Sequence, residues 1–127
     1  MGRLGDSSAR LVLPLDASLG PVVVGPMRSY LRLYRLPRSA SEFISERMER
    51  AVRRLAASVS PRPPRVCLTM RSRAGQLRVM LRVFRVGPRD LRLAPLTRGA
   101  PPTVKAEYRA GRQGGTLTFT SALKREG

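Results

Sequence analysis

The sequence has no histidine and no tryptophan, and only eight of its 127 residues are acidic. Without histidine it lacks the side chain best suited to proton transfer near neutral pH and the commonest zinc ligand. Three of the eight carboxylates fall in one predicted helix, within reach of arginines, and the others are scattered. Because no carboxylate pair indicates glycosidase or metal chemistry, we predict a protein that is not an enzyme and that holds no metal and no cofactor.

The single cysteine and the lack of long apolar runs exclude further classes. Cys67 cannot form an internal disulfide, and its place within a predicted strand, without a base or a second ligand, indicates a buried core thiol. No apolar run approaches the roughly 20 residues of a membrane span. The N-terminal sequence MGRLGDSS is not followed by the apolar stretch of a secretory signal. We therefore expect a protein that is not secreted by a signal peptide, and leave a mitochondrial presequence open.

Positive charge is the dominant property of what is present. Lysine and arginine number 25, of which 23 are arginine, and the formal net charge is +17. The region 61–127 holds fifteen of these cations and three acids. Such an excess implies a polyanionic partner. The preference for arginine suits bidentate binding of phosphate, and a GC-rich coding sequence explains it equally well.

The length predicts one domain with an aliphatic core, since apolar residues make up 42% of the chain and aromatic residues 5%. Eleven glycines and eleven prolines favour short strands joined by turns. We predict a flexible basic tail at 1–8, a single α+β domain at 9–123 and a basic tail at 124–127.

One long helix is predicted from residue 39 onward. Ser39 and Glu42 match the S-x-x-E capping box, in which the two side chains satisfy each other's free backbone amides. The apolar residues that follow recur every three or four positions and form one stripe, namely Ile44, Met48, Ala51, Val52, Leu55 and Val59. The sequence SVSPRPP at 58–64 ends the helix.

Alternating apolar residues predict strands over most of the remaining chain. The predicted strands are 10–16, 27–37, 65–73, 76–86, 91–96, 103–110 and 116–123, with a turn at 74–75 and a hairpin loop at 111–115. Pro14 places the first of them at an edge of the sheet. The expected fold is a twisted, mostly antiparallel sheet with one long amphipathic helix packed on one face.

The strand QLRVMLRVFRV at 76–86 carries arginines on one side. Leu77, Val79 and Leu81 point one way, and Arg78 and Arg82 the other. A solvated outer face explains polar residues here, but it would mix charges of both signs, and acids are scarce after residue 49. We therefore predict a polyanion-binding surface that consists of Arg32, Arg78, Arg82, Arg85, Arg92, Arg109, Arg112, Lys124 and Arg125.

The order strand, helix, long hairpin, loop and terminal hairpin over residues 27–123 resembles the core of rhabdovirus-type matrix proteins. The resemblance implies a viral matrix-like assembly protein that self-associates as a homo-oligomer, binds an anionic membrane surface and contacts nucleic acid or ribonucleoprotein. It would then lie in the virion, in the host cytoplasm or on the inner membrane surface. The PPxY and PTAP motifs are absent from the sequence.

The alternative prediction is a small RNA-binding protein of the ribosome or mitoribosome, which would use the same arginines on RNA. The sequence offers it little support, because no aromatic cluster of the kind that stacks bases is present. A structural subunit of a larger complex is the third possibility.

Overall fold

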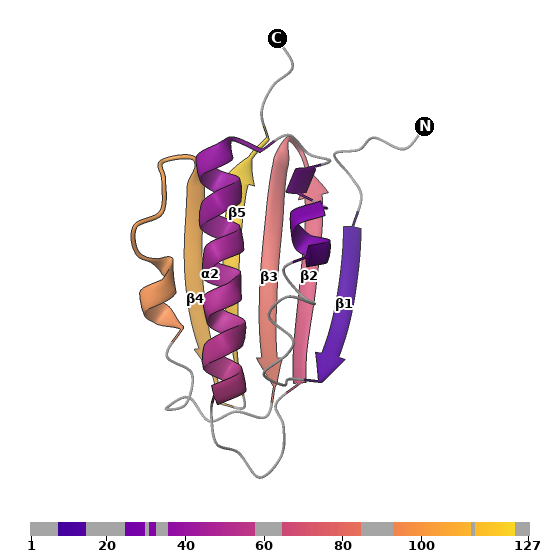
Figure 1. Cartoon of the computed structure of the whole chain (residues 1–127), viewed down its shortest axis with the longest axis vertical. Helices are drawn as coiled ribbons and strands as arrows, with labels where there is room; N and C mark the ends of the chain where they lie inside the picture. Colours follow the sequence, from indigo (N-terminus) through magenta and orange to yellow (C-terminus); the bar gives the residue numbers. More distant parts are fainter. Residues whose placement is uncertain are drawn as a thin grey trace.

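Alternating apolar residues build a five-stranded sheet in a computed structural model of the chain, which describes residues 8–14, 25–29, 31–32, 36–57, 65–84, 93–112 and 114–123. The strands are β1 (Ser8–Pro14), β2 (Arg65–Arg73), β3 (Gln76–Phe84), β4 (Val104–Gly111) and β5 (Gly114–Ala122). Their order is β1-β2-β3-β5-β4, and all four pairings are antiparallel (Figure 1). The predicted edge position of the first strand is confirmed, because among the described strands β1 pairs with β2 alone.

A two-residue turn fixes the register of the central hairpin. Ala74 and Gly75 both have positive φ, 54° and 75°, as the tight turns that match the twist of antiparallel strands require. Arg73 therefore pairs with Gln76, and each following pair is set by counting outward from it. The turn predicted at 74–75 is confirmed.

The helix α2 (Arg38–Ala57) crosses one face of the sheet, in front of β5 and β4 (Figure 1). Five of the six predicted stripe residues are buried: Ile44, Met48, Ala51, Val52 and Leu55. They belong to one core cluster with the inward residues of the strands. Within it the rings of Phe43 and Phe119 meet edge to face, with centroids 5.7 Å apart. Val59 lies outside the described residues.

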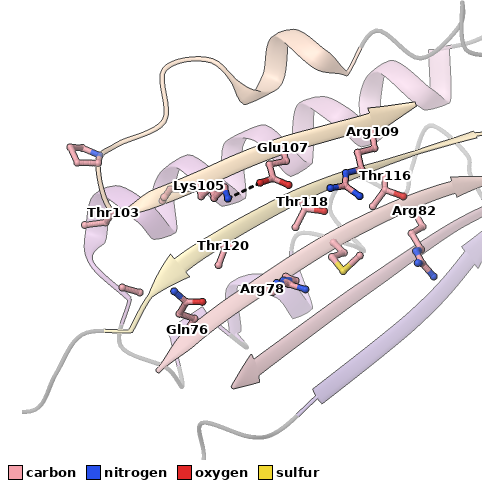
Figure 2. Close-up of a pocket in the computed structure, with 14 residues that line it drawn as sticks. Gln76, Arg78, Arg82, Thr103, Lys105, Glu107, Arg109, Thr116, Thr118 and Thr120 are labelled. Atoms are coloured by element: carbon pink, nitrogen blue, oxygen red, sulfur yellow. Dashed lines mark ion pairs between the residues drawn. The ribbon is translucent and has the colours of Figure 1, made fainter. Parts of the chain in front are cut away.

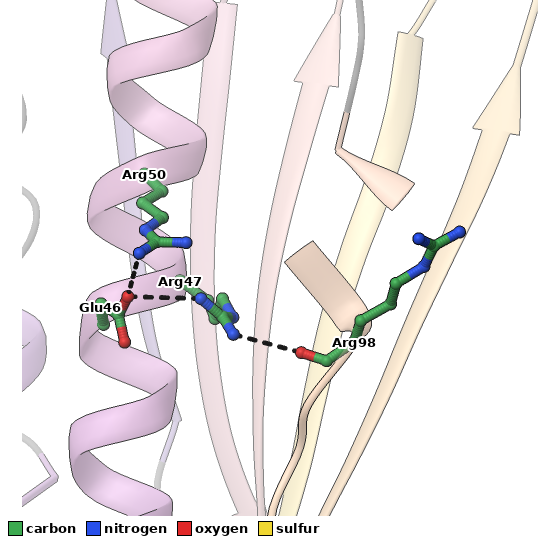
Figure 3. Close-up of polar contacts among 4 residues, drawn as sticks. All are labelled: Glu46, Arg47, Arg50 and Arg98. Carbon is green, nitrogen blue, oxygen red and sulfur yellow. Dashed lines mark hydrogen bonds and ion pairs between the residues drawn. The ribbon is translucent and has the colours of Figure 1, made fainter. Parts of the chain in front are cut away.

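Arg47 connects α2 to the segment before β4 through a hydrogen bond. Its guanidinium carbon lies 4.9 Å from the centre of the Phe43 ring, and its Nη2 donates to the backbone oxygen of Arg98 at 3.2 Å. Figure 3 shows this link beside the ion pairs of Glu46 with Arg47 and Arg50. Arg47 is only 17% exposed, so it acts as a packing residue of the helix.

The coarse prediction of an α+β fold with an antiparallel sheet and a helix is confirmed. The strand predicted at 27–37 is wrong, because residues 25–29 and 31–32 are helical. Met27 and Leu31, four positions apart, are buried in the core cluster, as one face of a helix requires. The helical residues 25–29 and 31–32 therefore cover this face of the sheet together with α2.

The strand predicted at 91–96 is also wrong where the structure describes it. Residues Ala94–Thr97 form the 3₁₀ helix η3, with Pro95 in its first turn, where its missing amide hydrogen costs nothing. Leu93 and Leu96 are buried three positions apart.

The capping box predicted at the start of α2 is wrong. The amide of Ser41 donates to the carbonyl of Pro37 at 3.0 Å, which makes Pro37 the N-cap and puts Ser39 inside the first turn. Glu42 accepts a hydrogen bond from Arg38 Nε at 2.9 Å. Two further i,i+4 ion pairs, Glu46–Arg50 and Glu49–Arg53, are formed along the helix, at 2.7 and 2.8 Å.

Replacing Ser39 by alanine is expected to leave the stability almost unchanged, within about 0.5 kcal/mol, because an exposed residue of the first turn makes no cap. Thermal melts of Ser39→Ala and of the parent protein test this. A loss of about 1 kcal/mol, the usual cost of removing a cap, would show that Ser39 caps the helix in solution.

Candidate functional site

The side of the sheet away from α2 carries exposed polar and charged side chains, and we call it the open face. Burial alternates along β3: Leu77, Val79, Leu81 and Val83 are buried, and the residues between them are exposed or half-buried. The same alternation on β4 puts Val104, Ala106 and Tyr108 toward the core. The open face is thus a direct consequence of the two-residue period.

The register of the strands arranges the open face in rows that run across it. We name three of these rows after their β3 residue. The Arg78 row is Arg71, Arg78, Thr120 and Lys105; the Met80 row is Thr69, Met80, Thr118 and Glu107; the Arg82 row is Cys67, Arg82, Thr116 and Arg109. On β2, β3, β5 and β4, cations therefore stand in the two outer rows and not in the Met80 row between them; on β1, Arg10 is the residue opposite Thr69.

A groove of about 610 Å³ runs along β5 on this face (Figure 2). Its floor is formed by the short side chains of Thr116, Thr118 and Thr120. The longer side chains of β3 on one side and of β4 on the other form its walls. Toward one end of the sheet the face also presents Phe84, which is 45% exposed.

Positive charge on the open face is not balanced from within the described part of the chain. On β2, β3 and β4 its cations are Arg65, Arg71, Arg73, Arg78, Arg82, Lys105 and Arg109, and its one acid is Glu107. Arg71 and Arg78 are direct cross-strand partners, which places their Cβ atoms about 4.5–5.5 Å apart, where like charges destabilise a sheet. An anion bound between them would remove this repulsion.

In contrast to the open face, the acidic side chains of α2 are all paired with arginines. Each of its three carboxylates pairs with an arginine: Glu42 with Arg38, Glu46 with Arg50 and Arg47, and Glu49 with Arg53. The sequence therefore neutralises much of the charge on the α2 side and leaves it uncompensated on the open face.

Glu107 pairs with Lys105 along the same strand, with Nζ and Oε1 3.0 Å apart. The hydrogen bond and the charge of Lys105, and more weakly the charges of Arg109 and Arg78, hold the pKa of the Glu107 carboxyl below its usual value. Burial opposes this shift but does not reverse it. Glu107 is therefore ionised at neutral pH and adds a fixed negative charge to the Met80 row.

Three of the predicted polyanion-binding residues lie together on the open face, namely Arg78, Arg82 and Arg109. Arg112 is exposed in the turn between β4 and β5. Arg85, Arg92, Lys124 and Arg125 lie outside the described residues.

The placement of Arg32 with the other predicted binding residues is wrong. It belongs to the helical residues whose Met27 and Leu31 pack into the core cluster that α2 shares. Arg32 is exposed, and the helical segment to which it belongs lies on the α2 side of the sheet (Figure 1). The strand assumed at 27–37 caused this error.

Four cations of the open face were missing from the predicted set: Arg65, Arg71, Arg73 and Lys105. A signal for the first three was present in the sequence. The strand at 65–73 alternates in phase with Val66, Leu68 and Met70, and the turn at 74–75 sets Arg71 opposite Arg78.

Cys67 is buried, as predicted, but it does not belong to the core cluster under the helix. It pairs with Arg82 across the strands, and its sulfur lies 3.8 Å from Thr69 Oγ1. Among the described residues no group of three histidines, cysteines or acids comes together as metal ligands would. Nor does the described part of the chain hold a helix with the length and apolar character needed to cross a membrane.

The fold is similar to one seen in a crystal structure of the RsbU and RsbW domains of Rv1364c from Mycobacterium tuberculosis. The TM-score is 0.66 at 17% sequence identity, over 93% of this chain and 33% of that one. The chain thus spans about a third of the length of the protein that it matches, and at this identity the likeness shows the fold alone. No family model matches the chain, and no curated protein is similar to it.

This likeness corrects the predicted function. The fold is similar to that of the RsbU and RsbW domains, so the prediction of a viral matrix-like assembly protein that binds membrane and ribonucleoprotein is wrong, and so is the ribosomal alternative. The resemblance in element order to rhabdovirus-type matrix proteins is not tested by any of these comparisons. The domain boundaries, the localisation and the lack of a cofactor stay predictions.

Proposed function

We propose that the chain is a non-catalytic regulatory domain whose open face binds an acidic segment of a partner protein. The observation that carries this proposal is the cross-strand pair Arg71 and Arg78 on an exposed sheet surface, for which the described part of the chain provides no ion-pair partner. Like charges kept side by side cost stability, and an acidic ligand that neutralises them offsets that cost. The fold is similar to that of the RsbU and RsbW domains, and the regulatory role is part of this proposal.

A peptide fits the open face better than a nucleic acid does. Each strand of a duplex carries one phosphate per 3.4 Å of helix axis, so a nucleic acid backbone that crosses the face would also set phosphates against Glu107. A peptide can leave that position uncharged. The threonines of the groove floor suit a peptide as well, because hydroxyls both donate to and accept from backbone amides.

The test is the binding of a fluorescently labelled, glutamate-rich peptide to the purified protein, followed by anisotropy. Arg78→Gln with Arg82→Gln is expected to weaken binding about ten-fold, since exposed ion pairs contribute about 0.2–1 kcal/mol each. Glutamine keeps most of the side-chain stem, so the fold should persist.

The matched control is Arg50→Gln with Arg53→Gln on α2, which removes the same net charge from the opposite side of the molecule. Peptide affinity should be almost unchanged in this control. Equal losses in both double variants would mean that only the overall charge matters, and the proposal would be wrong. Tighter binding of a single-stranded RNA of equal charge than of the peptide would also overturn it.

A further inference from the structure

We infer that the partner segment is an extended chain lying along β5, with acidic side chains at positions i and i+4 and an uncharged side chain at i+2. This inference rests on the function proposed above and specifies its ligand. Three features of the open face support it: the spacing of its cationic rows, the charge of the row between them and the width of its groove.

The spacing of the cations matches that of alternate residues in an extended peptide. Arg78 and Arg82 are four positions apart on β3, which is about 13–14 Å in a strand. The cations of β4, Lys105 and Arg109, repeat the same interval. In an extended ligand the side chains at i, i+2 and i+4 point to one side, so those at i and i+4 reach the Arg78 row and the Arg82 row together.

The Met80 row, which lies between these two rows, disfavours a third acidic side chain of the ligand. Glu107 is ionised there and paired with Lys105, and the β3 residue of this row is the half-buried Met80. A carboxylate at i+2 would face Glu107 without a cation of this row on β3, β5 or β4, whereas an apolar side chain would cover Met80. Glu107 thus acts as a specificity residue that sets which position of the ligand stays uncharged.

The width of the groove favours an extended ligand over a helix. Its walls stand on β3 and β4, which flank β5, so they are two strand spacings apart, or about 9.5 Å. A helix with its side chains is about 10–12 Å across and would rest on the walls without reaching the floor. An extended chain can descend to Thr116, Thr118 and Thr120, whose hydroxyls can bond its backbone.

The experiment compares two labelled peptides of identical composition that form no helix in solution. One has glutamate at i and i+4 with leucine at i+2, and the other has glutamate at i and i+2 with leucine at i+4. The first is expected to bind the wild-type protein about five- to twenty-fold more tightly, because the second exchanges one or two ion pairs for a repulsion. In Glu107→Gln the difference should fall below about three-fold through tighter binding of the second peptide.

The possible outcomes separate this inference from the proposal on which it rests. If both peptides bind equally, and more tightly than a glutamine-substituted control peptide, the inferred spacing of the acidic residues is wrong but the proposal of an acidic partner is not contradicted. Binding of neither peptide above the control would refute both. Tighter binding of a helical peptide with glutamates seven residues apart, which lie on one face of the helix about 10.5 Å apart along its axis, would overturn the extended form of the ligand.

Discussion

Reversing the charge of Arg78 and Arg82 together, by Arg78→Glu and Arg82→Glu, is expected to abolish binding of an acidic peptide and leave the protein folded. Each change removes an attraction and adds a repulsion of similar size, so the two sites together should cost about 2–4 kcal/mol of binding free energy. This corresponds to roughly a thirty- to thousand-fold weaker affinity. Anisotropy titrations of the parent and the variant measure it.

The same double substitution should raise the stability of the fold although it weakens binding. Arg71 lies directly opposite Arg78 on the neighbouring strand, and Arg78→Glu replaces a repulsive pair by an attractive one. The gain is about 0.5–1.5 kcal/mol, which raises the Tm by a few degrees. This gain is partly offset, because Arg78→Glu removes a positive charge that stabilises the ionised Glu107 carboxylate and lowers its pKa. The pKa of Glu107 should therefore rise toward its usual value in the variant.

Opposite effects on binding and stability distinguish a binding surface from a structural one. If Arg78 and Arg82 served mainly to hold the sheet together, their reversal would lower the Tm, and the affinity per folded molecule would stay unchanged. The same reasoning explains why a protein would keep Arg71 and Arg78 as neighbours, since a site that is strained when empty gains more from its ligand.

The central hairpin could be predicted from the sequence almost residue by residue. Strand β2 was expected at 65–73 and is found there, and β3 begins at Gln76 as predicted. Here alternation over nine residues agrees with a two-residue turn that contains Gly75, so local and cross-strand signals indicate the same structure.

The segments at 27–37 and 91–96 could not be predicted in this way, because short apolar runs fit two periods. Leu31 and Leu33 alternate as in a strand, but Met27 and Leu31 also fit a helix, and packing against the sheet decides between them. In the second segment the spacing of Leu93 and Leu96 suits the tighter 3₁₀ turn around Pro95.

The candidate site was predicted in part. The two-residue period was enough to place Arg78 and Arg82 on one side of a strand, and Arg109 followed from the same rule. That Lys105 shares a row with Arg78 depends on β5 lying between β3 and β4, which the chain order does not reveal. The chemical class of the partner could not be predicted from the composition, because a net positive charge indicates an anionic partner without indicating which kind.

Replacing Gly114 by alanine is expected to destabilise the protein by about 3 kcal/mol or more. Gly114 is the first residue of β5 and pairs with Phe84 at the end of β3. A Cβ atom on it would lie 1.8 Å from the carbonyl oxygen of Val83 and 2.9 Å from its carbonyl carbon. Both are backbone atoms of a central strand, so no side chain can turn aside and the two strands must separate at this end.

The matched control is Gly111→Ala, its partner across the β4–β5 hairpin. There the nearest atom to a new Cβ is the carbonyl oxygen of Gly114 at 3.5 Å, an ordinary contact. Thermal melts should show a Tm lower by roughly 10 °C or more for Gly114→Ala and nearly unchanged for the control. Equal melts would mean that the two strands lie further apart at this end than the structure places them.

The same substitution tests whether the site depends on the sheet beneath it. Thr116 and Arg109 lie two positions from Gly114 and Gly111 along their strands, so a separation of β3 from β5 would displace the Arg82 row before the Arg78 row. Among molecules that remain folded, Gly114→Ala should therefore weaken the peptide with glutamates at i and i+4 more than a peptide with a single glutamate. If both peptides lost the same factor, the distortion would be confined to the hairpin end and the spacing between the two cationic rows would be intact.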